Sequence, residues 1–560
     1  METSQPSSQH LPQEKLVPHP AAIIVPRRHG DVLIEPSAAE LADFLVAAES
    51  STRPSGSLDG IPIRTLASLA RGELIDAMTR FANEIGFDPP PTNAGVRPWV
   101  VTGHQVELYH PGVWSKVILA DALAKQSNSL AVDLLVDHDT VDQLGCVVPQ
   151  WSGSKLEKKL ITWADATAIP AEFLSSPQGG QKTRWLGDLR RFPLVQTDSR
   201  QEFMHQWQED TDPHYVSWMS RSRKRFERSF HINVQHVPCS YLCSGLAWHC
   251  FVLLWLRHAH AWCKTYNFAL DTYRRKHEIT NPGRPMPNLA IAENLLELPF
   301  WIYATNQPRH RLILQENDRP YMLYAARRVD VSDLLTGDLL AAGEMLRQRL
   351  HAANVSVRPR ALTLTMFVRL LLSDLFIHGI GGALYDQMTD QIMMNLFGVR
   401  PAYACASAGW LLPLAGFNDQ KIVNIPQLKW QEHHLRANPE QLAGESQLNG
   451  KTRSLLEERR TLIAGINQSL ITQRAEHRRR GPYWSQRRLD FQHLHDINAQ
   501  LLEVFAPQMH QMQSQIREAE LAAKNLSVAG WREYFIALHP RSSLQELIAT
   551  IQSSVISGRR

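Results

Sequence analysis

The sequence predicts an α/β fold with a parallel β-sheet core, a large insertion and a helical arm near the C-terminus. Three observations predict it. A strand–helix–strand pattern spans residues 99–136, and a second one, with a glycine turn, spans 375–406. Residues 431–525 carry apolar residues at spacings of three, four and seven. Two strands joined by a helix lie parallel, and the third pattern is typical of coiled-coil helices.

The length of the chain predicts several domains. At 560 residues it exceeds what one hydrophobic core organises, and its apolar fraction of 44% is ordinary for a globular protein. We expect six segments: a disordered tail (1–20), the first half of the core (21–144), an insertion that looks irregular (145–275), the second half of the core (276–430), a helical coiled-coil arm (431–525) and a C-terminal return to the globular body (526–560).

Charge and hydropathy argue against nucleic-acid and membrane partners. The formal net charge is +4, without the clustered basic excess of a nucleic-acid binder. The one dense basic run, Arg478–Arg480, is typical of a solvated helix corner. The most apolar stretch, Gly245–Trp262, contains an arginine and three histidines, so we expect a core helix there and no membrane span.

The six cysteines favour a reducing compartment. No apolar signal segment begins the chain, so we expect a cytoplasmic protein with free thiols. Four cysteines share residues 239–263 with three histidines, which raises zinc binding as an alternative. Their spacing does not fit the paired ligands of structural zinc sites, which favours core cysteines and no metal.

The elements before the first motif are a short strand and helices. Ala21–Pro26 predicts the strand, and the apolar spacing within residues 38–87 predicts the helical patterning. Trp99–Val101 then predicts a strand, Val113–Lys125 a helix and Ala131–Val136 a second strand. Ligands of parallel sheets bind at the carboxyl ends of the strands, so polar residues that follow these two strands are candidates for a site.

The first candidate group follows the first of these strands. Gly103 permits a sharp turn in which backbone N–H groups face a ligand. The helix that follows offers its positive N-terminus to an anion, and Lys116 adds a fixed charge. The alternative is a plain connection with polar surface residues. The residues of this group are Thr102, Gly103, His104, Gln105 and Lys116.

The second candidate group, Asp137, His138 and Asp139, ends the second strand. Three ionisable groups in a row are costly unless they are exposed or used. A histidine between carboxylates tends to have a raised pKa and can act as an acid or a base. The alternatives are a divalent metal site and a solvated loop.

The third candidate group lies in the second strand–helix–strand unit, which comprises Leu375–His378, Ala383–Phe397 and Ala402–Ala406. A glycine turn between strand and helix suits the close approach of a phosphate or carboxylate. Arg360, before an apolar helix that reaches Leu372, could hold an anionic substrate through two hydrogen bonds. The residues of this group are Arg360, His378, Gly379, Gly381, Gly382 and Tyr385.

The apolar spacing within the arm, residues 431–525, predicts two long antiparallel helices. Gly481 and Pro482 would turn the chain between them, and Pro507 would kink or interrupt the second. The apolar seam consists of Leu455, Leu462, Ile466 and Leu470 on one helix and Leu494, Ile497, Leu501 and Val504 on the other. The tail from Trp531 to Ile551 is expected to return to the globular body.

The order of these motifs resembles the bacillithiol biosynthesis cysteine-adding enzymes (BshC). In that family a Thr-Gly-Gln-Gln motif follows one strand and a Glu-Asp-His-Asp motif ends the next, matching residues 102–105 and 136–139 here. A Pro-Arg segment and a glycine-rich turn follow in the same order. Three positions depart from the pattern, which predicts a divergent member: His104 replaces a glutamine, Val136 a glutamate, and Gly382 an acidic residue.

The resemblance implies a nucleotidyltransferase-like Rossmann core and a coiled coil that supports a homodimer. It implies a ligase that joins cysteine to the amino group of a sugar-malate acceptor in low-molecular-weight thiol biosynthesis. His138, tuned by Asp137 and Asp139, would be the acid or base, and His104 a second polar contact. The cofactor is left open, with ATP or ADP as the candidate. Two alternatives remain, a nucleotidyl-transfer or metal-assisted hydrolytic enzyme using Asp137, Asp139 and His378, and a non-catalytic dimeric scaffold.

Overall fold

The computed structural model describes residues 17–21, 23–48, 56–325, 327–414, 423–443, 449–475 and 483–556. The chain divides into two compact units, each with a hydrophobic core of its own. The first unit comprises residues 1–149, 158–412 and 531–560, and the second comprises 150–157 and 413–530.

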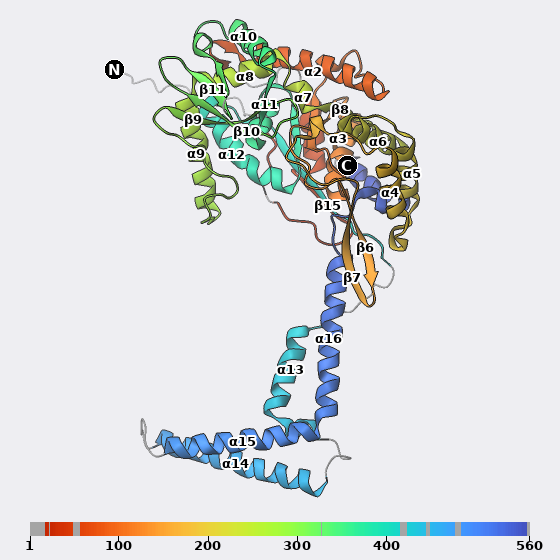
Figure 1. The fold of residues 1–560 in the computed structure, drawn as a ribbon, viewed down its shortest axis with the longest axis vertical. Coiled ribbons are helices and arrows are strands. Elements are labelled where there is room, and N and C mark those ends of the chain that lie inside the picture. The colour runs from red at the N-terminus through yellow and green to blue at the C-terminus, as the bar shows by residue number, and fades with distance from the viewer. Residues whose placement is uncertain are drawn as a thin grey trace, which may run out of the picture. The chain divides into compact units, whose positions relative to one another are not determined.

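A six-stranded sheet organises the first unit (Figure 1). All its strands run parallel except β1, which pairs with β15 in the antiparallel sense. In spatial order the strands are β1 (Asp31–Glu35), β15 (Tyr403–Gly409), β14 (Leu375–His378), β4 (Trp99–Gln105), β5 (Leu130–Val136) and β8 (Gln235–Pro238). Along the chain, β5 and then β8 are added on one side of β4, and the next strand of this sheet, β14, pairs with the other side of β4. Such a reversal opens a crevice at the carboxyl ends of β4 and β14.

The two strand–helix–strand patterns of the sequence are confirmed as β4–α3–β5 and β14–α12–β15. Helix α3 spans Pro111–Ser127 and helix α12 spans Ile380–Phe397. Both faces of β5 are buried, as its near-continuous apolar sequence requires in a sheet covered on both sides. The mixed α/β fold with a parallel sheet is therefore present.

The boundaries near the first motif differ from expectation. Residues 102–105 are the last four residues of β4, and no turn begins at Gly103. Glycine suits this position because a Cβ would lie 3.1 Å from the carbonyl oxygen of Leu134 on the adjacent β5. The strand expected at 21–26 is wrong for the described residues there, and the first strand is β1, further along. The helical patterning of 38–87 corresponds to α1 (Ala38–Ala47) and α2 (Ile63–Ile85), with the short hairpin strands β2 (Ser57–Leu58) and β3 (Ile61–Pro62) between them.

A second, antiparallel sheet belongs to the same unit. In spatial order it contains β12 (Arg327–Asp330), β11 (Tyr321–Tyr324), β10 (His310–Gln315), β9 (Leu295–Ala304) and β13 (Val355–Pro359). Helix α10 (Leu339–Ala352) precedes β13. Strand β13 leads directly into α11 (Ala361–Leu371), so the start of α11 is fixed by this sheet.

The expectation of irregular structure over 145–275 is wrong. The stretch contains the hairpin strands β6 (Gly145–Ser152) and β7 (Lys155–Thr162), strand β8, and helices α4 (Gly179–Arg190), α5 (Asp198–Glu209), α6 (Tyr215–Ser229), α7 (Cys239–Leu242), α8 (Leu246–Arg257) and α9 (Ala259–Lys276). It also supplies part of the core, because β8 pairs with β5 and α8 is buried over nearly its whole length.

The expected core helix and core cysteines are confirmed. All six cysteines are free and buried. Among the described residues, no helix is both long and apolar enough to cross a membrane. In the same part of the chain, no cluster of three histidine, cysteine, aspartate or glutamate side chains is placed to hold a metal ion.

The second unit is helical. Its helices are α13 (Ile425–Ala437), α14 (Gly450–Ala475), α15 (Tyr483–Val504) and α16 (Ala506–Ala529). Leu455 on α14 packs with Ile497 and Leu501 on α15, in a small core that includes Phe505. The second predicted helix is interrupted at Phe505, as expected near Pro507, whereas Gly481 and Pro482 lie outside the described residues. The tail returns to the first unit as expected, where α17 (Arg541–Ile556) packs on α3.

Candidate active site

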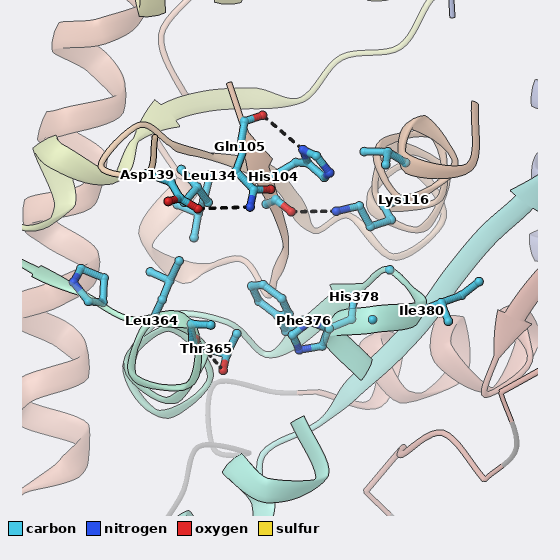
Figure 2. Close-up of a pocket in the computed structure, with 18 of the residues that line it drawn as sticks. His104, Gln105, Lys116, Leu134, Asp139, Leu364, Thr365, Phe376, His378 and Ile380 are labelled. Carbon is cyan, nitrogen blue, oxygen red and sulfur yellow. Dashed lines mark hydrogen bonds between the residues drawn. The ribbon is translucent and has the colours of Figure 1, made fainter. Parts of the chain in front are cut away.

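A cavity of about 640 Å³ lies at the carboxyl ends of β4, β5 and β14 (Figure 2). His104 and Lys116 lie on one side of it, across from Phe376 and His378. All three candidate groups contribute to the lining. The predicted residues that line the cavity are Gly103, His104, Gln105, Lys116, His138, Asp139, Arg360, His378, Gly379, Gly381 and Gly382.

Three predicted residues do not line this cavity. Thr102 is fully buried, and its hydroxyl donates a hydrogen bond of 2.9 Å to the carbonyl of Ile377, which ties β4 to β14. Tyr385 is 39% exposed on α12. Asp137 turns to the start of α7, where it accepts from the backbone N–H of Ser240 at 2.9 Å and from its hydroxyl at 2.5 Å. Burial, with the nearby Glu172 carboxylate, raises the pKa of Asp137 to about 7.

The charge of the lining is positive. Among the described residues that line the cavity, the cationic side chains are Lys116, Arg309, Arg360 and Arg532. Arg309 is paired with Asp139, and Arg360 is paired at 2.7 Å with Glu297, which does not line the cavity. Lys116 donates to the carbonyl of Gly103 at 2.7 Å, and burial lowers the pKa of its ammonium to about 8. A ligand with phosphate or carboxylate groups would therefore be favoured in this cavity.

Three helices begin at the cavity. The first turns of α3, α11 and α12 all contribute to the lining, and each helix has eleven or more residues. The N-terminus of a helix carries roughly half a positive charge and unpaired N–H groups. The first turn of α3 has no free donor, because Pro111 lacks an N–H and Gly112 and Val113 donate to His110, so α3 adds only the charge of its dipole. The starts of α11 and α12 can also provide backbone donors for an anion.

The histidines at the ends of β4 and β5 are neutral at pH 7. The prediction of a raised pKa for His138 is wrong, because burial lowers it to about 4 despite the nearby Asp139. The Nδ1 atom of His138 is buried and has no hydrogen-bond partner among the described residues. Burial and the charge of Lys116 lower the pKa of His104 to about 3. Both rings are therefore unprotonated at neutral pH, and their low pKa values make them weak bases in this structure.

His378 has a partner that the sequence did not reveal. Its Nε2 donates to Asp386 at 2.8 Å, and Asp386 also accepts from Arg369 at 2.5 Å. Burial lowers the pKa of His378, whereas Arg369 and His378 hold the pKa of Asp386 well below its usual range. Asp386 and Asp390 lie one turn apart on α12, and both are buried. The feature of the sequence that could have revealed these contacts is Arg369, which lies in the mostly apolar α11. A buried arginine needs carboxylate partners.

Further lining residues come from the antiparallel sheet and were not predicted. Arg309 precedes β10 and forms an ion pair with Asp139. Its guanidinium lies 4.8 Å from the ring centroid of Trp301 on β9, and Arg360 lies 5.2 Å from the same ring. No local pattern in the sequence shows that this sheet lies beside the parallel one, so these residues could not be predicted to line the cavity.

The geometry lends no support to a metal site shared by Asp137, Asp139 and His378. Their polar atoms are bonded to Ser240, Arg309 and Asp386 respectively. Comparison of the chain with protein-family models and with curated proteins found no match. The function must therefore be argued from the cavity and from the motifs that line it.

Proposed function

We propose that the chain is a ligase or transferase that joins an amino acid, with cysteine as the first candidate, to the amine of an anionic acceptor. The observation that supports this most is the meeting of four cationic side chains and three helix N-termini at one cavity. Both reactants of such an enzyme carry carboxylate groups, and a sugar-malate acceptor carries two of them. The resemblance of residues 102–105 and 136–139 to the cysteine-adding family suggests the substrates.

The chemistry requires a proton acceptor and anion contacts. An amine attacks a carbonyl carbon only when its nitrogen has lost a proton, and a neutral imidazole at the site can take that proton. His138 is neutral at pH 7 and lines the cavity. Lys116, Arg360 and the first turn of α12 would hold carboxylate groups. When bound, ATP or ADP would supply phosphate for carboxyl activation, and its phosphates suit the same positive surface.

The proposal includes a Rossmann-like core of the nucleotidyltransferase type. Numbered along the chain from β4, the parallel strands lie in the order 5-4-1-2-3, with the cavity at the reversal between strands 4 and 1. That order is typical of dinucleotide-binding folds. The proposal also includes a cytoplasmic homodimer, with α14 and α15 of the second unit as a coiled coil at the interface.

The test is a product assay on the full chain. Purified protein is incubated with cysteine, ATP and glucosaminyl-malate, and the thiol product is sought by mass spectrometry. We expect product from the wild-type protein and at least about a hundredfold less from His138→Ala. His205→Ala, which removes a histidine that is 71% exposed on α5, is the matched control. Absence of product from the wild-type protein would overturn the substrate assignment. Absence of any thermal shift with anionic ligands as well would favour a non-catalytic scaffold.

A further inference from the structure

We propose that His378 is a second proton acceptor of the cavity, working through Nδ1, and that Asp386 and Arg369 are the residues that position it. This inference rests on the proposed function for its substrate. The proton would move from the attacking amine nitrogen to Nδ1 of His378. As the new C–N bond forms, the C–O bond to the activating group breaks, and the proton passes to the departing oxygen.

The hydrogen bond at Nε2 decides which nitrogen of His378 is free. Asp386 is ionised and can only accept, so the ring must carry its hydrogen on Nε2. The neutral ring then presents a lone pair at Nδ1. Nδ1 has no hydrogen-bond partner among the described residues, and His378 lines the cavity (Figure 2). This is the arrangement that a general base requires.

Asp386 is held in place by two donors on α11 and by the ring of His378. Thr365 of α11 donates to its Oδ1 at 2.9 Å, and Arg369 of α11 donates to its Oδ2. Arg369 is fully buried and also donates to Asp390 at 2.6 Å. With the bond from His378, the Asp386 carboxylate has three donors, so it can neither rotate freely nor take up a proton near pH 7. The orientation of the His378 ring is therefore fixed by Asp386, which does not itself line the cavity.

The glycine turn contributes space. A Cβ at Gly382 would lie 2.6 Å from Nδ1 of His378, closer than real Cβ contacts come. A Cβ at Gly381 would meet nothing within 4 Å. Gly382 is thus tied sterically to the one ring atom that the proposal uses, and Gly381 is not.

The first test reads the ring directly and needs no substrate. In ¹⁵N-histidine-labelled full-length protein at pH 7, we expect His378 to be neutral with its hydrogen on Nε2, assigned by loss of its signals in His378→Gln. Asp386→Asn replaces an obligatory acceptor by an amide that can also donate, so we expect the tautomer to become mixed. Asp390→Asn is the matched control, because it removes the other carboxylate on Arg369 and should leave the His378 signals in place. A charged ring, or a hydrogen on Nδ1 in the wild-type protein, would overturn the proposal.

The paired glycine variants test the steric element. We expect Gly382→Ala to shift the His378 ring signals and Gly381→Ala to leave them unchanged. Equal effects of the two variants would contradict the role assigned to Gly382.

The second test separates positioning from folding. We expect His378→Ala and Asp386→Asn each to lower kcat by about a hundredfold or more, with a smaller effect on KM. If Asp386 acts through His378, the double variant is no worse than His378→Ala. Multiplying losses would overturn the positioning role. Lack of product from the wild-type protein would instead refute the proposed function, and the ring measurement would still decide whether His378 is held as a base.

Discussion

The carboxyl ends of β5 and β14 each carry a histidine with carboxylates near it, and the two arrangements are opposite. His138 has carboxylates on both sides in sequence, yet Asp137 bonds Ser240, Asp139 bonds Arg309, and Nδ1 of His138 has no partner among the described residues. His378 has no acidic neighbour in sequence, yet Asp386, eight residues later, bonds its ring. Sequence adjacency at a strand end therefore does not make a pair.

The difference follows from backbone geometry. Asp137, His138 and Asp139 lie in a turn that follows β5, and there each carboxylate bonds a residue of another segment instead of the histidine between them. A helix that starts right after a strand folds back over it, and its second turn can reach the last strand residue. The sequence pattern Asp-His-Asp was thus the weaker sign of a histidine–carboxylate pair, and the helix carboxylate was the stronger one.

The largest effect expected at these two strand ends concerns Arg369. Arg369→Met leaves Asp386 and Asp390 buried without their cation, and we expect a loss of about 3–5 kcal/mol in the free energy of unfolding. Arg358→Met, on β13, removes the cation from Glu172 and should cost less, because it leaves one buried carboxylate without its cation instead of two. Denaturant unfolding of both variants measures the difference. A larger loss of unfolding free energy in Arg358→Met than in Arg369→Met would contradict the greater weight given to the ion pairs of Arg369 with Asp386 and Asp390.

The pH dependence of stability should differ with the sign of each pKa shift. Since His138 has a pKa of about 4 in the folded chain and about 6.5 unfolded, the unfolded chain binds more protons between these values. The wild-type protein should therefore lose roughly 2–3 kcal/mol relative to His138→Gln as the pH falls from 6.5 to 4. Unfolding curves at several pH values test this.

Asp137 provides a control with the opposite sign. Its pKa is about 7 in the folded chain and about 3.8 unfolded, so its contribution to stability is present at low pH and is lost as the pH rises through 7. Relative to Asp137→Asn, the wild-type protein should weaken as the pH rises from 4 to 7. Parallel slopes in the two comparisons would mean that the environments of the two side chains are not distinct.

The smallest effect expected concerns Thr102, which joins β4 to β14. Thr102→Val keeps the shape of the side chain and removes its hydrogen bond to the carbonyl of Ile377. We expect a loss of about 1 kcal/mol in the free energy of unfolding, with binding of anionic ligands unchanged. A larger change in binding than in stability would place Thr102 in the site after all.

Much of the fold could be predicted from periodicity. Continuous apolar strands followed by amphipathic or buried helices identified β4–α3–β5 and β14–α12–β15. Strand β8 was missed because its sequence, Gln-His-Val-Pro, contains no apolar run, whereas the equally short β14 begins Leu-Phe-Ile. The antiparallel sheet was missed as a wall of the cavity because its position depends on packing that no local pattern records.

The candidate site could be predicted in outline. Eleven of the lining residues were predicted, most of them polar residues or glycines at the ends of parallel strands, since the carboxyl ends of such strands share one edge. The charge states could not be predicted. His138 was expected to be easily protonated, but burial outweighs the attraction of Asp139. The positions of Arg309 and Asp386 depend on contacts across 170 and eight residues, which composition does not encode.

The three helix N-termini at the cavity affect how this protein can diverge. The partial charges at the starts of α3, α11 and α12 belong to backbone peptide groups, so they do not depend on which side chains are present and do not change with pH. Mutations can exchange lining side chains one at a time while that field persists. The departures from the motif pattern at His104, Val136 and Gly382 are changes of side chain only. If the cavity binds an anion as we propose, such changes would alter which anion is selected, whereas the favourable field of the helix N-termini would stay with the placement of the helices.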